Sequence, residues 1–265
     1  MSGWGSNSVP GGELRLIGLN GMPEIRPGDD LDAMIGQAIE RSGAGLEPGD
    51  VLIVTHKIVS KAEGRLVRLA DVEPSALARQ FAASANKDAR QVEIVLRESR
   101  RIVRMDRGVI IAETAHGLIC ANAGVDASNV EPETVCLLPV DPDASAVRVR
   151  DAIGRRFGLS PETAPAVVIT DSFGRPWRNG IVNVAIGVAG LAPLADYRGY
   201  HDPAGYELHV TVLAVADELA AAAELVMHKL DARPVVLIRG YLPPIDAPPG
   251  TGRDLIMEPG RDLFR

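Results

Sequence analysis

The sequence predicts a mixed α+β fold organised as a two-lobed subunit. Short apolar runs rich in β-branched residues, such as Val51–Val54 and Val167–Ile169, are typical of buried strands. Longer segments with apolar residues at helical spacing, such as residues 31–39, are typical of amphipathic helices. These segments do not alternate in a regular βαβ order, and no repeat of fixed period is visible. We therefore expect mixed strands and helices, with a smaller lobe within about residues 62–117.

Composition and charge exclude several classes of protein. Hydrophobic residues make up 46% and charged residues 24% of the 265-residue chain, which is an ordinary balance for a globular protein. The formal net charge of −7 argues against a nucleic-acid binder, because such a protein needs a basic surface to neutralise phosphates. No apolar run approaches the roughly 20 residues that span a bilayer, so we expect no membrane association.

The N-terminus and the cysteines indicate a cytoplasmic protein. Residues 1–13 are rich in Gly and Ser and lack the basic and apolar regions of a signal peptide. We expect them to form a disordered tail, followed by one domain over residues 14–265. Cys120 and Cys136 have neither CxxC spacing nor a nearby pair of His residues, which argues against zinc. Both are expected to be buried free thiols.

The first half of the chain contains three clear segments of secondary structure. Residues 14–17 are expected to form a first strand. The turn Pro27–Asp30 places an acidic cap before a helix that ends at about residue 42, where Ser and Gly follow. Val51–Val54 is a second buried strand, and the lysines at positions 57 and 61 come just after it. Their spacing of four puts both lysines on one face of a helix or a strand.

The rest of the chain continues the mixed pattern. Two apolar runs around the turn at 106–108 predict a hairpin, and a further strand is expected at 118–123. A Pro- and Asp-rich segment predicts a helix entry at about residue 139 and a helix to about residue 157. An Ala-rich helix is expected over about 215–230. Two more apolar runs predict strands at 210–214 and 234–239.

One stretch, Ala166–Gly180, combines a buried strand with polar residues that could carry chemistry. Its apolar run stops at Thr170–Ser172, and we expect the strand to leave the core there and enter a loop containing Arg175 and Arg178. Asp171, like Asp126, stands just after an apolar strand. The pair would suit Mg²⁺ if the two strands are neighbours, because Mg²⁺ takes one or two carboxylates beside phosphate oxygens and waters.

Alternatives to a metal and phosphate site remain open at this point. An Asp after a strand is usually a turn former, and an arginine-containing loop is usually solvated. Neither of the common phosphate-binding motifs, GxxxxGK[ST] and GxGxxG, occurs in the chain. Lys61 would supply a positive charge to a phosphate if a nucleotide binds by another route.

Several segments, taken together and in order, resemble a known family. They are GMPEIRPGDDL, VTHKIVSKAEGR, ANAGVDASNV, LLPVDPDAS, VVITDSFGRPWRNG and AVADELAAAAELV. The chain is similar over nearly its whole length to coenzyme F-420-0:L-glutamate ligase, the γ-glutamyl ligase of deazaflavin cofactor biosynthesis, in its stand-alone form. The resemblance implies a mixed α/β, two-lobed subunit in an intertwined homodimer.

The resemblance also implies a reaction. GTP would activate the side-chain carboxylate of coenzyme F-420-0 as an acyl phosphate, and the amine of L-glutamate would attack it to form an amide, GDP and phosphate. Mg²⁺ or Mn²⁺ would be required, together with K⁺. Two other classes are kept as alternatives, namely a metal-dependent phosphohydrolase and a non-catalytic nucleotide-binding module.

Site residues follow from the resemblance, motif by motif. The guanine nucleotide would contact Met22, Pro23, Glu24, Ile25, His56, Lys61 and Asn129. The metal would be held by Asp126, Asp171 and Ser172. The catalytic residues are expected to be Lys61, which offsets phosphoryl charge, and Arg175 and Arg178, whose guanidinium groups match carboxylate or phosphate. Two positions depart from the family, which often has Ser in place of His56 and Thr in place of Ser172.

Overall fold

The computed structural model describes residues 12–262, so residues 1–11 of the expected tail lie outside the described part. The helices are α1 (Leu31–Ser42), α2 (His56–Ala62), α3 (Ala76–Ala85), α4 (Ala89–Glu98), α5 (Pro142–Phe157) and α6 (Val215–Met227). The first strands are β1 (Arg15–Gly18), β2 (Val51–Thr55), β3 (Leu66–Arg68), β4 (Ser99–Asp106), β5 (Val109–Thr114) and β6 (Ile119–Ala121). The others are β7 (Thr134–Cys136), β8 (Ala166–Arg175), β9 (Arg178–Ala189), β10 (Ala195–Asp196), β11 (Val212–Leu213) and β12 (Val235–Arg239). Short 3₁₀ turns are η1 (Leu69–Asp71), η2 (Asn122–Gly124), η3 (Gly252–Leu255) and η4 (Pro259–Arg261).

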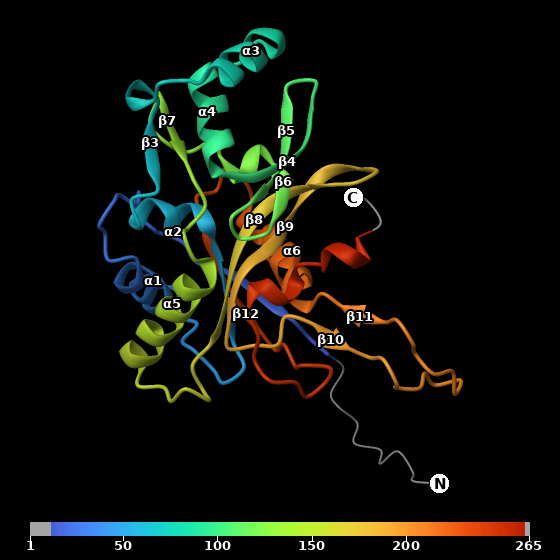
Figure 1. The fold of residues 1–265 in the computed structure, drawn as a ribbon. Helices are drawn as coiled ribbons and strands as arrows, with labels where there is room; N and C mark the ends of the chain where they lie inside the picture. Colours follow the sequence, from blue (N-terminus) through green and yellow to red (C-terminus); the bar gives the residue numbers. More distant parts are fainter. Residues whose placement is uncertain (1–11, 263–265) are drawn as a thin grey trace.

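A five-stranded sheet forms the centre of the molecule (Figure 1). Its strand order is β1-β12-β2-β8-β9; β2 and β8 run parallel, and the other neighbours run antiparallel. Successive side chains of a strand enter opposite cores. Leu52 and Val54 pack with α1 and α5, whereas Val51 and Ile53 pack with α6. The sheet is therefore buried on both faces, which explains why its inner strands are continuously apolar.

Helix α1 shows how local sequence fixes an element of this layer. The Asp30 side chain caps the helix by accepting a hydrogen bond from Ala33 N at 3.0 Å. Ile35 and Ile39 are fully buried, and Gly43 ends the helix in the left-handed conformation at φ 68°. The predicted start and end of this helix are both confirmed.

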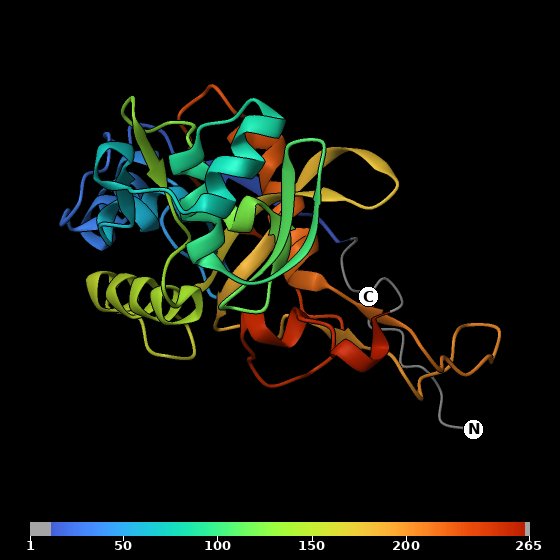
Figure 2. The same ribbon diagram turned by 45° about the horizontal axis from the view of Figure 1, so that its top comes forward.

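The elements from β3 to β7, residues 66–136, group at one end of the central sheet (Figures 1 and 2). Helices α3 and α4 pack on the three-stranded sheet β4-β5-β6, and β3 pairs with β7. Two buried clusters of their own support this group, one around Val92 and Ile110 and one around Leu69 and Leu137. The predicted hairpin is confirmed as β4–β5. The division into two lobes, and the homodimer, stay predictions.

The loop expected after Thr170–Ser172 is wrong, although the strand does leave the buried core there. Strand β8 continues to Arg175 and pairs with β9 as a long hairpin, with register shifts after Ile169 and after Gly174. The polar residues continue the strand because the pairing with β9 satisfies their backbone groups beyond the buried core. The turn at the tip has Trp177 at φ 56° and Gly180 at φ 84°.

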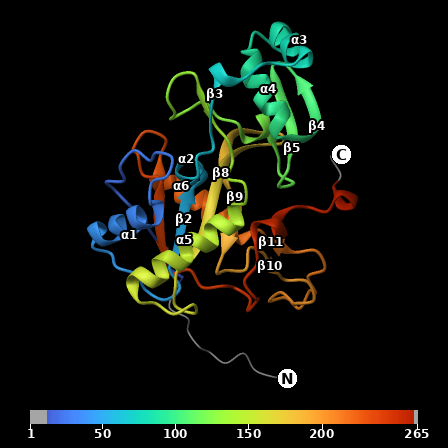
Figure 3. The ribbon, with the colours of Figure 1, turned by 60° about the vertical axis from the view of Figure 1, so that its left-hand side comes forward.

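Other expectations need smaller corrections. Helix α6 ends at Met227 rather than near residue 230, and the predicted strand at 210–214 shrinks to β11, which forms a two-stranded sheet with β10. The segment joining β10 and β11 extends away from the central sheet (Figures 1 and 3). Within residues 12–262, no helix has the length and apolar character needed to cross a membrane.

Candidate active site

An open cavity of about 670 Å³ lies at the edge of the central sheet where the parallel pairing of β2 with β8 ends. Its wall includes all the residues predicted to hold a nucleotide or metal: Met22, Pro23, Glu24, Ile25, His56, Lys61, Asp126, Asn129, Asp171 and Ser172. The structure thus brings together residues from the loop after β1, helix α2, the loop after η2 and strand β8. The far wall comes from the end of α6 and the residues after it.

Asp126 reaches this cavity by a route that the strand pattern does not predict. Strand β6, which precedes it, belongs to a different sheet from β8, so the two aspartates do not follow neighbouring strands of one sheet. Asp126 instead exchanges two backbone hydrogen bonds with Cys136, the last residue of β7, at 3.0 and 2.8 Å. This bridge fixes the loop after η2 against the cavity.

Consecutive residues at the start of α2 contact the two aspartates. His56 Nε2 lies 3.2 Å from Asp171 Oδ1. Lys57 Nζ donates to Asp126 Oδ2 at 2.5 Å and to the Ser128 carbonyl at 2.9 Å. Burial would raise the pKa of Asp126, but the hydrogen bonds from Lys57 and Ser128 outweigh it and hold that pKa below its ordinary value. Asp126 is therefore an anion at neutral pH.

Lys61 is the most buried cation at this wall, with 6% of its surface exposed. Its Nζ donates to Glu24 Oε1 from the loop after β1, and the Glu24 side chain is 73% exposed. An exposed carboxylate is easily displaced because solvent weakens the pairing. Lys61 can thus exchange Glu24 for an oxygen of a bound anion.

A closed ring of four side chains, which sequence reasoning missed, joins β8, β9 and α6. Ser172 Oγ donates to Asn183 Oδ1 at 2.6 Å, and Asn183 Nδ2 donates to Glu224 Oε2 at 2.8 Å. Lys229 Nζ lies 3.3 Å from Glu224 Oε1 and donates to Ser172 Oγ at 2.8 Å. The sequence feature that could have indicated this ring is Asn183, a lone amide within an apolar run. Asn183 is 3% exposed, and a buried amide needs hydrogen-bond partners.

The donor atoms in the cavity suit a hard divalent cation. Asp126, Asp171 and Ser172 offer oxygen ligands, which Mg²⁺ and Mn²⁺ prefer. Beside Asp171, the Thr170 hydroxyl is buried and has no hydrogen-bond partner among the described residues. No group of three or more His, Cys, Asp or Glu residues converges on one point within residues 12–262. A metal held here would therefore need oxygens from its substrates, as Mg²⁺ often does.

The two predicted arginines lie away from this wall. Arg175 and Arg178 pair with each other at the end of the β8–β9 hairpin, and neither lines the cavity. Arg175 Nη2 donates to the Asn179 carbonyl at 2.9 Å, and the neighbouring Trp177 is 81% exposed. Ile181, which pairs with Gly174, does line the cavity, so the hairpin leads from the cavity to this tip.

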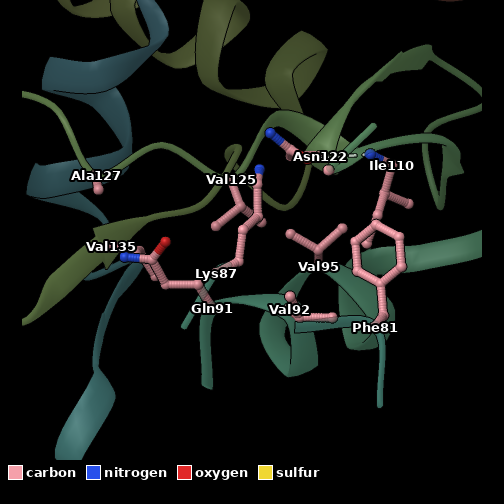
Figure 4. A pocket seen from close by; sticks show the side chains of 11 residues that line it. Phe81, Lys87, Gln91, Val92, Val95, Ile110, Asn122, Val125, Ala127 and Val135 are labelled. Atoms are coloured by element: carbon pink, nitrogen blue, oxygen red, sulfur yellow. Dashed lines mark hydrogen bonds between the residues drawn. The ribbon is translucent and has the colours of Figure 1, made fainter. Parts of the chain in front are cut away.

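A second cavity, of about 50 Å³, lies between α4, β5 and the loop after η2 (Figure 4). Val92, Val95 and Ile110 line it, together with Lys87, Gln91 and Asn122. Asn122 Oδ1 accepts a hydrogen bond from Ile110 N at 3.4 Å. This volume holds only a few water molecules, so it cannot accept a nucleotide.

The fold gathers lysines and a pair of aspartates in one cavity at the edge of the central sheet. The family model for F420-0:Gamma-glutamyl ligase matches residues 21–240, and the chain belongs to this family. It is 46% identical over 245 residues to coenzyme F420:L-glutamate ligase of Methanopyrus kandleri, covering 91% of this chain and 94% of the relative. The proteins of the same name from Methanothermobacter thermautotrophicus and Methanocaldococcus jannaschii are 45% and 41% identical. The aligned regions cover 86% and 96% of this chain, and 89% and 97% of the two relatives, respectively.

Proposed function

We propose that this protein is a GTP-dependent ligase that joins the side-chain carboxylate of coenzyme F-420-0 to the amine of L-glutamate. Family membership supports the ligation of glutamate to the deazaflavin cofactor. The observation that carries the finer proposal is the single cavity that gathers ten residues implied by the family motifs, including both aspartates and Lys61. Its volume of about 670 Å³ lies within the range of roughly 300–1,000 Å³ for small-molecule sites.

In this proposal the nucleotide binds along the wall formed by the loop at Met22–Ile25 and by Lys61 of α2. Lys61, released from Glu24, pairs with the phosphates. The free carboxylate of F-420-0 is a poor acyl donor, so it attacks the γ-phosphorus of GTP and GDP leaves. Lys61 offsets the charge on the transferring phosphoryl group.

The amine of L-glutamate then attacks the acyl carbon, and phosphate departs as the amide forms. Asp126, Asp171 and Ser172 would hold Mg²⁺ or Mn²⁺, which would supply charge neutralisation at the phosphates. Arg175 and Arg178 would bind a carboxylate or phosphate of the acceptor or of glutamate, from the hairpin that leads out of the cavity. A requirement for K⁺, the homodimer and a cytoplasmic location belong to the same proposal.

Product analysis tests the reaction directly. The protein is incubated with F-420-0, L-glutamate, GTP and Mn²⁺, and the products are followed by mass spectrometry and by release of GDP. We expect a glutamylated product and GDP only when acceptor and glutamate are both present, and a loss of at least tenfold in rate for Asp171→Asn.

Two outcomes would replace this proposal with another. Equal hydrolysis of GTP without acceptor or glutamate would favour a metal-dependent phosphohydrolase. Binding of GTP with no product from either the parent or Asp171→Asn would favour a nucleotide-binding module. Light scattering of the purified protein tests the homodimer separately.

A further inference from the structure

His56 is placed to act on Asp171 rather than on a ligand. It is 4% exposed and is the first residue of α2, at the inner wall of the larger cavity. An imidazole has only two polar atoms. Nε2 lies 3.2 Å from Asp171 Oδ1, and Nδ1 lies 3.3 Å from the hydroxyl of Ser60, which is fully buried. The ring therefore cannot form a hydrogen bond to a nucleotide without leaving one of these partners.

Asp171 is held through one of its two oxygens. Oδ1 accepts a hydrogen bond from Ser172 N at 2.7 Å and faces His56. No residue within 12–262 forms a hydrogen bond to Oδ2, although the side chain lines the cavity and is 17% exposed. A carboxylate held in this way keeps a fixed orientation and presents its second oxygen to a ligand.

We propose that His56 is a positioning residue that orients the Asp171 carboxylate for a divalent cation, in place of the nucleotide contact implied by the family resemblance. The inference rests on the proposed function, because that function assigns Asp171 to the metal. Partners that orient metal ligands commonly change metal affinity by roughly 10- to 100-fold when they are removed.

Three substitutions at His56 distinguish the contribution of Nε2 from that of Nδ1. His56→Gln puts an amide NH₂ near the position of Nε2, within reach of Asp171. His56→Asn puts the same group near the position of Nδ1, within reach of Ser60. His56→Ala removes both. The Asn variant is a matched control for the Gln variant because both carry the same amide group.

The Mn²⁺ dissociation constant of the full chain is measured from the electron paramagnetic resonance signal of free Mn²⁺. We expect it to rise roughly tenfold or more for His56→Ala and His56→Asn, and to stay within about threefold of the parent for His56→Gln. The KM for GTP at saturating Mn²⁺ should stay within about twofold for all three. Thermal melting checks that each variant is folded.

Several results would overturn the inference. They are unchanged Mn²⁺ affinity in His56→Ala, equal losses in His56→Gln and His56→Asn, or a raised KM for GTP with unchanged Mn²⁺ affinity. If the parent ligates glutamate and binds Mn²⁺, these results contradict only the proposed role of His56 and leave the proposed function standing. If the parent binds no Mn²⁺ and forms no product, the proposed function fails with it.

Discussion

Lys57 Nζ donates a 2.5 Å hydrogen bond to Asp126 Oδ2, so the ammonium group occupies one of the carboxylate oxygens predicted to hold the metal. The Lys57 side chain is 15% exposed, and it is also bonded to the carbonyl and hydroxyl of Ser128. A cation that binds Asp126 at Oδ2 must therefore displace this lysine.

Lys57→Met is predicted to lower the stability of the metal-free protein and to raise its affinity for metal. Without metal, the partly buried Asp126 loses its counter-charge, and we expect the free energy of unfolding to fall by about 1–2 kcal/mol. With Mn²⁺, the variant should be stabilised more than the parent because no ammonium competes. Urea unfolding with and without Mn²⁺ measures both effects. Lys57→Arg, which keeps the charge, is the control; equal stabilisation of parent and Lys57→Met by Mn²⁺ contradicts the prediction.

Asn183→Ala is predicted to destabilise the wall that joins β8, β9 and α6. Asn183 bonds both Ser172 and Glu224, so its removal leaves two polar groups without this partner and should cost about 1–3 kcal/mol. Urea unfolding measures the loss. Asn179→Ala, on the same strand but exposed, should change stability by less than about 0.5 kcal/mol. Similar losses in both variants would show that the buried ring contributes little.

The sequence was sufficient to predict the inner strands and helix α1. Val51–Val54 is apolar at every position because both faces of β2 are covered, and the Asp30 cap and the Gly43 stop are local signals. The extension of β8 beyond Ile169 was not predicted, because it depends on pairing with β9 rather than on residue types in β8. Long-range pairing of this kind leaves little trace in a single segment.

Only those residues of the candidate site that belong to the sequence motifs could be predicted. The residues of the Asp171 motif and of the loop at Met22–Ile25 line one cavity. The partner of Lys57 was not predicted. Its side chain is largely buried against Asp126, and nothing local in the sequence reveals a partner 69 residues away. Glu224 and Lys229 likewise join the wall only because α6 ends beside β9.

Arg175→Ala and Arg178→Ala are predicted to affect the acceptor rather than the nucleotide. Both residues lie at the hairpin tip, beyond Ser172 and outside the cavity wall. Because a charge-assisted hydrogen bond contributes about 1.5–3 kcal/mol, the KM for F-420-0 or for glutamate should rise by roughly 10- to 100-fold. Steady-state kinetics with each substrate varied in turn should show the KM for GTP unchanged. An increase confined to GTP would place the arginines at the nucleotide instead.

Glu93→Gln is predicted to lower stability in a pH-dependent way. Hydrogen bonds from Ser75 and then Arg97 lower the pKa of Glu93 from 4.5 to about 2. Because the folded pKa is the lower one, the stabilisation is complete above about pH 4.5 and is lost as the pH falls towards 2. Urea unfolding of the parent and of Glu93→Gln measures the effect. The free energy of unfolding should be lower in the variant by about 1 kcal/mol at pH 6, and by less at pH 3.5. The exposed Glu131→Gln should show no difference, and a pH-independent gap for Glu93→Gln would contradict this origin.

Both cysteine thiols are predicted to resist modification in the folded protein. Burial, and then the charge of Asp171, raise the pKa of Cys120 to about 12, and burial raises the pKa of Cys136. A raised pKa favours the neutral thiol over the reactive thiolate. At pH 8 the fraction of Cys120 in the thiolate form is therefore smaller than that of a free cysteine by on the order of a thousandfold. Ellman's reagent should therefore detect two thiols in urea and react slowly at pH 8 without it. Rapid labelling of the folded chain, assigned by mass spectrometry to Cys120, would show that β6 opens beside Asp171.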